Sequence, residues 1–229
     1  MSPEHTKPTQ ENMKIIALCG MPGAGKSTFK ELARHLGVPS WYVGQPLVEL
    51  CQRNGVEPTY ANRMAAGSTS GLFDPANPMK FIQYSLLQMS TRHPGATAII
   101  FDSVRSLAEL QFLRSAQEDV ALVAVLLGRA ERIRRLVRRD AAPAEQVEAR
   151  DRMEIGLCDP FHRSMGVGQL IAMADYYVLT PADDTQAPSV TLQVGEILQR
   201  LGISPSPSAP CQTSLSAPRP FSMKQSNNQ

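Results

Sequence analysis

Short apolar runs alternate with longer amphipathic stretches from residue 13 to residue 203 of this chain. The apolar runs are β-prone and predict buried strands at residues 14–19, 40–43, 98–102, 120–127 and 176–179. Helical spacing predicts helices at residues 28–36, 46–54, 106–117, 130–139, 144–156, 166–174 and 189–201, with broken helical segments over 58–93. Strands that alternate with helices predict an α/β fold of three layers, in which helices cover both faces of a parallel sheet.

Both ends of the chain are polar. Residues 1–12 are predicted to be disordered, and residues 204–229 form a tail rich in Ser, Pro, Gln and Asn. Such a tail has too few apolar residues to bury a core of its own. We therefore expect one folded domain over residues 13–203. The tail is either inert or a docking segment for a partner.

Composition narrows the class of protein. The chain has 229 residues, with 23 basic against 21 acidic side chains and a net charge of +2. This balance argues against a dedicated nucleic-acid-binding protein, and we expect no DNA partner. No apolar run reaches the roughly 18 residues that span a membrane, and the polar N-terminus lacks a signal-peptide core. Because the four cysteines are also scattered, we expect a cytoplasmic protein with reduced thiols and no membrane partner.

The glycine-rich segment Gly20–Thr28 fits the pattern G-x-x-x-x-G-K-[ST] in full. It follows an apolar run and precedes a helix, which is the context of a phosphate-binding P-loop. The glycines let backbone N–H groups point at phosphate oxygens, and the helix N-terminus adds partial positive charge. We expect Lys26 to reach the β- and γ-phosphates of ATP and Ser27 to bind Mg²⁺. The predicted nucleotide-binding residues of this segment are Gly20, Pro22, Gly23, Ala24, Gly25, Lys26, Ser27 and Thr28.

Two charged residues lie at and just beyond the end of the strand predicted at 98–102. Asp102 ends the strand, so its carboxylate is expected beside the P-loop, where it would hold Mg²⁺ together with Ser27. A helix-capping or turn role for Asp102 is the alternative. Arg105 would clamp a second phosphate with its planar guanidinium, and the alternative is a solvated side chain.

Arginines are concentrated in the predicted helix 130–139 and again near residue 150. Arg135 and Arg139 are four residues apart and share a helix face. Phosphoryl transfer builds negative charge that several arginines neutralise, so we expect these side chains near the phosphates. Residues 139–152 are expected to form a mobile lid that brings its arginines over the site. A solvated basic face or an RNA-binding helix would have a similar composition.

Together these features resemble the nucleoside-monophosphate-kinase-like P-loop kinases, and most closely a kinase-like family related to adenylate kinase and dephospho-CoA kinase. The segments that carry the resemblance are residues 20–27, Gly44 with 54–59, residues 100–106 with Glu109, Arg135–Arg139 with 150–152, and residues 171–176. The resemblance covers about residues 13–200. It implies a five-stranded parallel sheet, a helical acceptor-binding insertion near 44–92 and an arginine-rich lid near 139–152.

The resemblance also implies roles for single residues. By analogy with adenylate kinases, Arg135 would flank the adenine and Arg139 would contact the transferring phosphate. Arg150 and Arg152 would be lid arginines. Thr180 and Pro181, after the last strand, would lie near the base.

This sequence departs from the family pattern at two places. Gln45 stands where the family usually has an aspartate after its second strand, so the charge that helps order Mg²⁺-bound water or the acceptor is missing. Glu49, one helical turn further on, is a candidate substitute. Residues 158–166 look like additional sequence relative to the family.

We therefore predict an ATP-dependent phosphotransferase that acts on a nucleotide or nucleotide-like, phosphate-bearing small molecule, with Mg²⁺ assisting in-line transfer. Two alternatives remain open. One is a nucleotide-binding switch or slow NTPase that acts on a protein or RNA partner, which Gln45 and the C-terminal tail favour. The other is a pseudo-kinase that binds nucleotide for stability alone.

Overall fold

The structure is a computed structural model, and it describes residues 13–140, 143–156, 165–181 and 187–204. The predicted disordered N-terminus (1–12), all of the predicted tail except Ser204, and most of the additional segment 158–166 lie outside the described residues.

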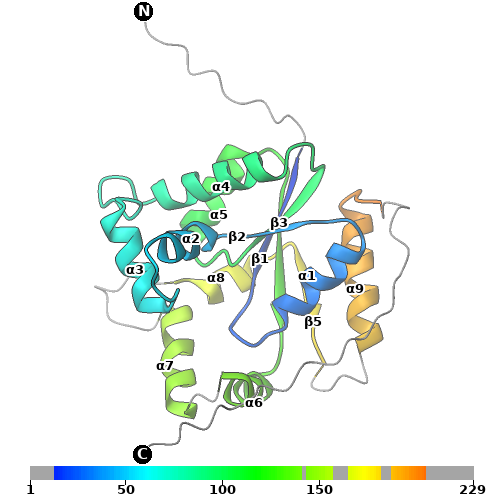
Figure 1. Cartoon of the computed structure of the whole chain (residues 1–229). Coiled ribbons are helices and arrows are strands. Elements are labelled where there is room, and N and C mark those ends of the chain that lie inside the picture. The colour runs from blue at the N-terminus through cyan, green and yellow to red at the C-terminus, as the bar shows by residue number, and fades with distance from the viewer. Residues whose placement is uncertain (1–12, 141–142, 157–164, 182–186, 205–229) are drawn as a thin grey trace, which may run out of the picture.

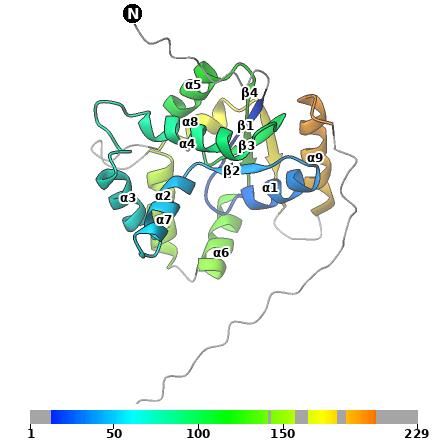
Figure 2. The same ribbon diagram turned by 45° about the horizontal axis from the view of Figure 1, so that its top comes forward.

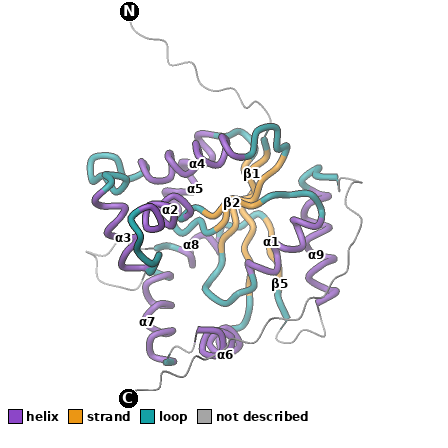
Figure 3. The backbone as a smooth tube through the Cα atoms, in the orientation of Figure 1, coloured by secondary structure: helices purple, strands orange, loops and turns teal. Residues whose placement is uncertain are grey.

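Five parallel strands form the centre of the molecule (Figures 1 and 3). They are β1 (Lys14–Cys19), β2 (Ser40–Tyr42), β3 (Ala98–Asp102), β4 (Val120–Leu126) and β5 (Tyr176–Leu179). Their order in the sheet is β2-β3-β1-β4-β5. The register pairs Leu18 of β1 with Asp102 of β3, and Cys19 with Ala124 of β4. The predicted five-stranded parallel sheet is confirmed, and the last residues of β1 and β3 meet at one edge.

Nine helices occur within the described ranges. They are α1 (Lys26–His35), α2 (Gln45–Arg53), α3 (Tyr60–Thr69), α4 (Lys80–Arg92), α5 (Leu107–Ala116), α6 (Arg129–Asp140), α7 (Ala144–Glu154), α8 (Val167–Ala172) and α9 (Ala187–Arg200). The broken helical segments predicted over 58–93 are the two helices α3 and α4. Their break falls in the stretch with Gly71, Pro75 and Pro78, because glycine and proline interrupt helices.

The side chains of β1 alternate between two hydrophobic cores, one on each face of the sheet. Ile15, Ala17 and Cys19 pack with residues of α4, α5 and α8, whereas Ile16 and Leu18 pack with residues of α1 and α9. Figure 2 shows α1 and α9 together on one side of the strands. Burial of an isoleucine or leucine side chain such as Ile15 or Leu18 stabilises the folded state by about 2 kcal/mol, compared with leaving it exposed. The predicted three-layer α/β fold is therefore confirmed.

Two helix pairs flank the sheet. Helix α2 packs on α3, and α6 packs on α7. In Figure 1 the α2–α3 pair lies at the left and the α6–α7 pair at the bottom. None of the helices in the described parts of the chain is both long enough and apolar enough to cross a membrane.

Candidate functional site

The loop between β1 and α1 depends on two of its glycines. Gly25 has φ +101°, and a Cβ atom there would lie 2.6 Å from Cγ2 of Thr180. Gly20 has φ +140°, and a Cβ atom there would collide with the carbonyl oxygen of Val125. Thr180 also donates a hydrogen bond from Oγ1 to the Ala24 carbonyl at 2.7 Å. The loop is therefore held closely against β4 and the end of β5, in a shape that only glycine allows at these positions.

Lys26 is the first residue of α1, and its ammonium group folds back over the loop. Nζ donates to the carbonyl of Gly20 at 2.5 Å and lies 3.3 Å from that of Met21. Burial lowers the pKa of Lys26, while the negative charges of Asp102 and Glu154 act in the opposite direction. No carboxylate among the described residues lies within hydrogen-bond distance of this half-buried ammonium, so it is well placed to bind an anion that enters the loop.

A cavity of about 780 Å³ opens over this loop. It brings together most of the predicted site residues, which are Gly20, Pro22, Gly23, Ala24, Gly25, Lys26, Ser27, Asp102, Arg105, Arg135, Arg139 and Arg150. Lys30 and Arg138 also line it. Two predicted residues, Thr28 and Arg152, are exposed and do not line the cavity.

Arg152 is excluded from the cavity by the geometry of α7. Val147, Asp151 and Glu154 form the buried face of this helix. Arg150 and Glu154 line the cavity. Each residue is rotated by about 100° from the next, so Arg152 lies on the opposite side of the helix from Arg150. Arg150 and Arg152, both predicted as lid arginines, are thus separated by helical periodicity.

Asp102 is 4% exposed at the end of β3. Its Oδ2 accepts a hydrogen bond from Lys30 Nζ at 2.5 Å, and its Oδ1 accepts one from Ser103 Oγ at 3.2 Å. Ser103 itself has φ +76°, a left-handed conformation that is unusual for a residue other than glycine. Sequence reasoning missed Lys30, although its place one turn after Lys26 on the same helix face was a usable signal.

The oxygen donors in this cavity fit Mg²⁺. Ser27 contributes a hydroxyl and Asp102 a carboxylate, and both line the same cavity. Mg²⁺ prefers such oxygen ligands, and in nucleotide sites it takes one or two from the protein and others from phosphates and water. The described residues contain no group of three or more His, Cys, Asp or Glu side chains that would hold a metal alone.

A buried ion pair joins the α6–α7 pair to the P-loop. Arg132 Nη1 and Nη2 donate to the two carboxylate oxygens of Asp151 at 3.0 and 2.8 Å, and Nη1 also donates to the Pro22 carbonyl at 3.0 Å. Both side chains are less than one-tenth exposed. Sequence reasoning missed this pair because the arginines around residue 132 are alike in composition, and only packing distinguishes the buried one.

The other α6 arginines have partners at the cavity rim. Arg135 Nη2 donates to the Pro181 carbonyl at 2.5 Å, which places Pro181 beside the cavity. The preceding residue, Thr180, lies against Gly25 of the loop. Arg139 is 62% exposed and pairs with its neighbour Asp140 at 2.6 Å. This pair uses Nε and Nη2 of Arg139, so the predicted contact with a transferring phosphate would fall to Nη1 unless the pair opens.

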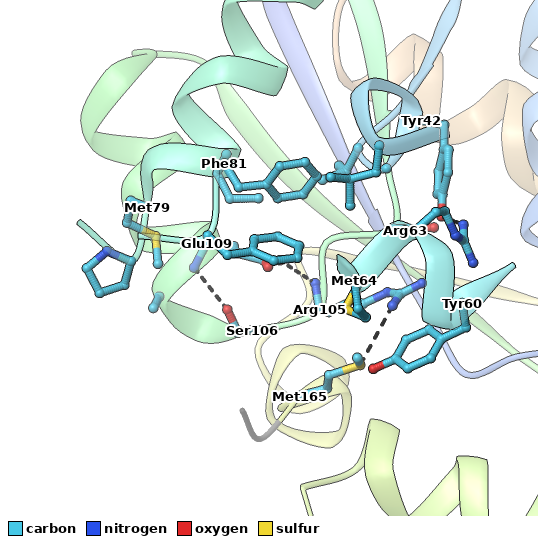
Figure 4. Close-up of a pocket in the computed structure, with 18 of the residues that line it drawn as sticks. Tyr42, Tyr60, Arg63, Met64, Met79, Phe81, Arg105, Ser106, Glu109 and Met165 are labelled. Atoms are coloured by element: carbon cyan, nitrogen blue, oxygen red, sulfur yellow. Dashed lines mark hydrogen bonds between the residues drawn. The ribbon is translucent and has the colours of Figure 1, made fainter. Parts of the chain in front are cut away.

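A second cavity, of about 630 Å³, lies beside the first (Figure 4). Residues of α2, α3 and α4 and of the segment that joins α3 to α4 supply many of its walls, and these residues lie within the region 44–92 that was predicted to bind the acceptor. Tyr42, Arg63, Ser103 and Arg105 line both cavities. The sequence offered no signal for Arg63, which is one polar residue in a helix without a motif.

Arg105 is positioned by the cap of α5. Ser106 Oγ accepts a hydrogen bond from the Glu109 backbone N–H at 3.2 Å, and Glu109 Oε2 accepts one from the Arg105 backbone N–H at 2.7 Å. This reciprocal cap fixes the chain where it leaves β3. Burial raises the pKa of Glu109, and the hydrogen bond from Arg105 counteracts that shift.

Gln45 and Glu49 lie outside both cavities. Gln45 Nε2 donates to Glu49 Oε1 at 3.0 Å, and the Glu49 carboxylate takes two hydrogen bonds from Arg92 at 2.5 and 2.7 Å. These hydrogen bonds lower the pKa of Glu49 to about 2. Glu49 therefore does not supply the missing carboxylate in this structure, because Arg92 holds it away from the P-loop.

A buried parallel strand, a glycine-rich loop, a helix and an adjacent acidic strand end define a P-loop nucleotide-binding domain. A family profile described as "AAA domain" matches residues 16–155, and the chain belongs to this family. It also belongs with the UPF0200 proteins. The relative from Hyperthermus butylicus is 31% identical over 177 residues, which cover 72% of this chain and 84% of that protein. The expected P-loop family is thus confirmed.

Two further similarities agree with this assignment. The UPF0200 protein of Methanothrix thermoacetophila is 29% identical over 169 residues, covering 71% of this chain and 85% of that protein. The crystal structure of TT1252 from Thermus thermophilus aligns with a TM-score of 0.55 and 17% identity, covering 83% of this chain and 98% of that one. This second likeness concerns the fold alone.

Proposed function

We propose that the protein is an ATP-dependent phosphotransferase that acts on a nucleotide or nucleotide-like small molecule. The observation that carries the proposal is the meeting of two cavities at Tyr42, Arg63, Ser103 and Arg105. A simple NTPase needs a cavity for the triphosphate, whereas a phosphotransferase needs an adjoining cavity for the acceptor. In-line transfer also requires the acceptor oxygen to approach the γ-phosphorus from the side opposite the leaving ADP.

The P-loop would bind the triphosphate. Backbone N–H groups of residues 20–27 and the N-terminus of α1 would surround the β-phosphate, and Lys26 would leave the carbonyls of Gly20 and Met21 for the β- and γ-phosphates. Arg135, anchored on Pro181, would flank the adenine. Thr28 would lie at the edge of this nucleotide site.

The cations around the cavity would stabilise the charge that develops during transfer. Lys26, Arg105, Arg139 and Arg150 line the cavity from four different segments. Preorganised cations in a site from which water is excluded commonly contribute the largest share of catalysis. Closure of the segment 139–152 would bring Arg139 and Arg150 inward, and Arg152 would need a larger rearrangement to join them.

Ser27 and Asp102 would hold Mg²⁺, which would neutralise phosphate charge and orient the transferring group. For a direct bond Asp102 would offer Oδ1, which Lys30 does not hold, or Lys30 would release Oδ2; Asp102 could instead hold a metal-bound water. In either case Lys30 stays close enough to balance the charge of the carboxylate.

The test is coupled ADP production with a panel of nucleotides and dephospho-CoA as acceptors. We expect at least one acceptor to raise turnover, and Lys26→Ala to abolish the increase while its melting temperature without nucleotide stays near that of the wild type. If no acceptor raises turnover above the Lys26→Ala control, the phosphotransferase proposal fails. Hydrolysis that ignores every acceptor would point instead to a nucleotide-dependent switch or slow NTPase.

A further inference from the structure

We propose that the acceptor is a small oxyanion, a phosphate monoester or a carboxylate, joined to an apolar or aromatic body. Arg63 and Arg105 bind the oxyanion where the two cavities meet, and the second cavity receives the body. This inference rests on the proposed phosphotransferase function and names the class of its second substrate. It also adds Arg63 to the binding residues.

The guanidinium groups of Arg63 and Arg105 have few hydrogen-bond partners among the described residues. Arg63 Nη1 donates to the Tyr42 hydroxyl at 2.9 Å, but its Nε is buried and has no hydrogen-bond partner. Among the described residues, the Arg105 side chain donates one hydrogen bond, from Nη1 to Met165 Sδ at 3.8 Å, and thioether sulfur is a weak acceptor. Within the described ranges neither guanidinium takes part in an ion pair. A buried donor without an acceptor, such as Arg63 Nε, is costly, so an anion from outside the chain would satisfy it and would also pair with the Arg105 guanidinium.

The position of these arginines supports the same conclusion. Both line the P-loop cavity as well as the second cavity, so an anion between them would lie next to the transferring phosphate. Figure 4 shows Tyr42 and Arg63 at one end of the second cavity and Met79 at the other. Arg63 is thus at the end of the second cavity that adjoins the P-loop cavity.

The remaining walls of the second cavity identify the body of the acceptor. They are mostly aromatic side chains, prolines and methionines, with Tyr60, Met64, Phe73, Pro75, Met79 and Phe81 among them. Such walls bind apolar surface, and methionine adapts to irregular shapes. A volume of about 630 Å³ leaves room for a body the size of one or two rings.

Two of the polar groups on these walls, Ser106 Oγ and Glu109 Oε2, already have hydrogen-bond partners. In the cap of α5, Ser106 Oγ accepts a hydrogen bond from the Glu109 backbone N–H, and Glu109 Oε2 accepts one from the Arg105 backbone N–H. A body that carried many hydroxyl groups would lose its hydrogen bonds to water and find few replacements here. The cavity therefore favours an apolar ring over a sugar of the same size.

The first experiment compares probes on the full chain by isothermal titration calorimetry, with a non-hydrolysable ATP analogue and Mg²⁺ present. Phenyl phosphate tests the aromatic body, ribose 5-phosphate the polar body, and 3-phenylpropanoate the carboxylate in place of phosphate. We expect phenyl phosphate to bind at least about tenfold more tightly than ribose 5-phosphate. Equal affinities for these two probes would overturn the inference, and the carboxylate probe decides between the two kinds of oxyanion.

Matched variants test the two halves of the cavity. Arg63→Gln is expected to weaken the binding of phenyl phosphate about 10- to 100-fold, because a charged hydrogen bond is lost. Arg53→Gln, at an exposed arginine outside the cavities, is expected to leave this affinity unchanged. Ala108→Leu narrows the second cavity and is expected to weaken the apolar probe, whereas Ala116→Leu on the same helix does not. Unchanged binding in Arg63→Gln or in Ala108→Leu would contradict the inference.

The outcome separates this inference from the proposed function. Binding as expected, with no ADP formed from any acceptor, would leave the binding class standing and remove the phosphotransferase activity. Turnover of polar acceptors that is insensitive to Ala108→Leu would leave the activity standing and remove the inference. ATP-analogue affinity, measured separately for each variant, shows whether the P-loop cavity is intact.

Discussion

Lys30 Nζ lies 2.5 Å from Asp102 Oδ2, so the carboxylate that ends β3 is already paired with a cation from α1. Asp102 is almost fully buried, while the Lys30 side chain is 27% exposed. A buried carboxylate without a partner is costly, and Lys30 removes that cost when no metal is bound. Under the proposed function, the same ammonium would compete with Mg²⁺ for this carboxylate.

Replacing Lys30 by methionine tests this competition. Lys30→Met keeps most of the side-chain volume and removes the charge. We therefore expect the Mg²⁺ concentration at the midpoint of the titration to fall about tenfold. The measurement is the rise in melting temperature with a fixed concentration of ATP while Mg²⁺ is titrated.

Lys30→Arg is the control, because it keeps the charge and should leave the Mg²⁺ midpoint near that of the wild type. An unchanged midpoint in Lys30→Met would show that Lys30 and Mg²⁺ do not compete. A lower melting temperature without ATP in Lys30→Met is expected as well, since Asp102 then lacks its partner.

Gly25→Ala is predicted to distort the P-loop. The added Cβ would lie 2.6 Å from Cγ2 of Thr180, and alanine disfavours the φ of +101°. The left-handed conformation alone costs about 1–2 kcal/mol. We expect a lower free energy of unfolding in urea and a loss of ATP binding. Gly128→Ala, where an added Cβ meets nothing within 4 Å, serves as the control and should leave both unchanged.

Sequence patterns were sufficient for the fold because each local signal agreed with the global one. The run from Ile15 to Cys19 is apolar on both of its alternating faces, and the structure places these faces in two cores. Such a strand belongs inside a parallel sheet. The P-loop motif was equally informative, because its glycines encode a backbone shape rather than a side-chain contact.

Much of the site could not be read from the sequence because it depends on pairs of residues far apart in the chain. Arg132 and Asp151 are 19 residues apart, and nothing in their neighbours distinguishes them from exposed charges. Arg63 lines both cavities from α3, which packs on α2, and its Nη1 donates to the Tyr42 hydroxyl of β2. Conversely, Glu49 was a reasonable candidate by spacing, but Arg92 from α4 holds it elsewhere.

Glu49 gives the protein a defined dependence of stability on pH. Its pKa is lowered from an ordinary value of 4.5 to about 2, chiefly by the hydrogen bonds from Arg92. A carboxyl group with a lowered pKa stabilises the fold fully above its unfolded pKa, and this contribution is lost as pH falls through the folded value. The contribution of Glu49 is therefore complete at pH 7 and disappears between about pH 4.5 and 2.

Glu49→Gln tests this dependence. We expect the variant to have a lower melting temperature than the wild type at pH 7, and the difference to shrink steadily as the pH is lowered toward 2. Glu31→Gln, at an exposed glutamate paired within α1, is the control and should change the melting temperature little at any pH. A difference for Glu49→Gln that is the same at pH 7 and pH 3 would contradict the assignment.

The buried pair of Arg132 and Asp151 is predicted to hold α7 against α6 and the P-loop. Asp151→Asn removes the charge but keeps the shape, which leaves the Arg132 guanidinium buried without a counter-charge. Breaking one partner of such a pair costs about 3–5 kcal/mol, measured as the free energy of unfolding in urea. Glu148→Gln, in the exposed pair with Arg129, should cost less than about 1 kcal/mol.

Because Arg132 also donates to the Pro22 carbonyl, Asp151→Asn should weaken ATP binding too. Equal stabilities of the two variants would show that this pair does not join α7 to the P-loop.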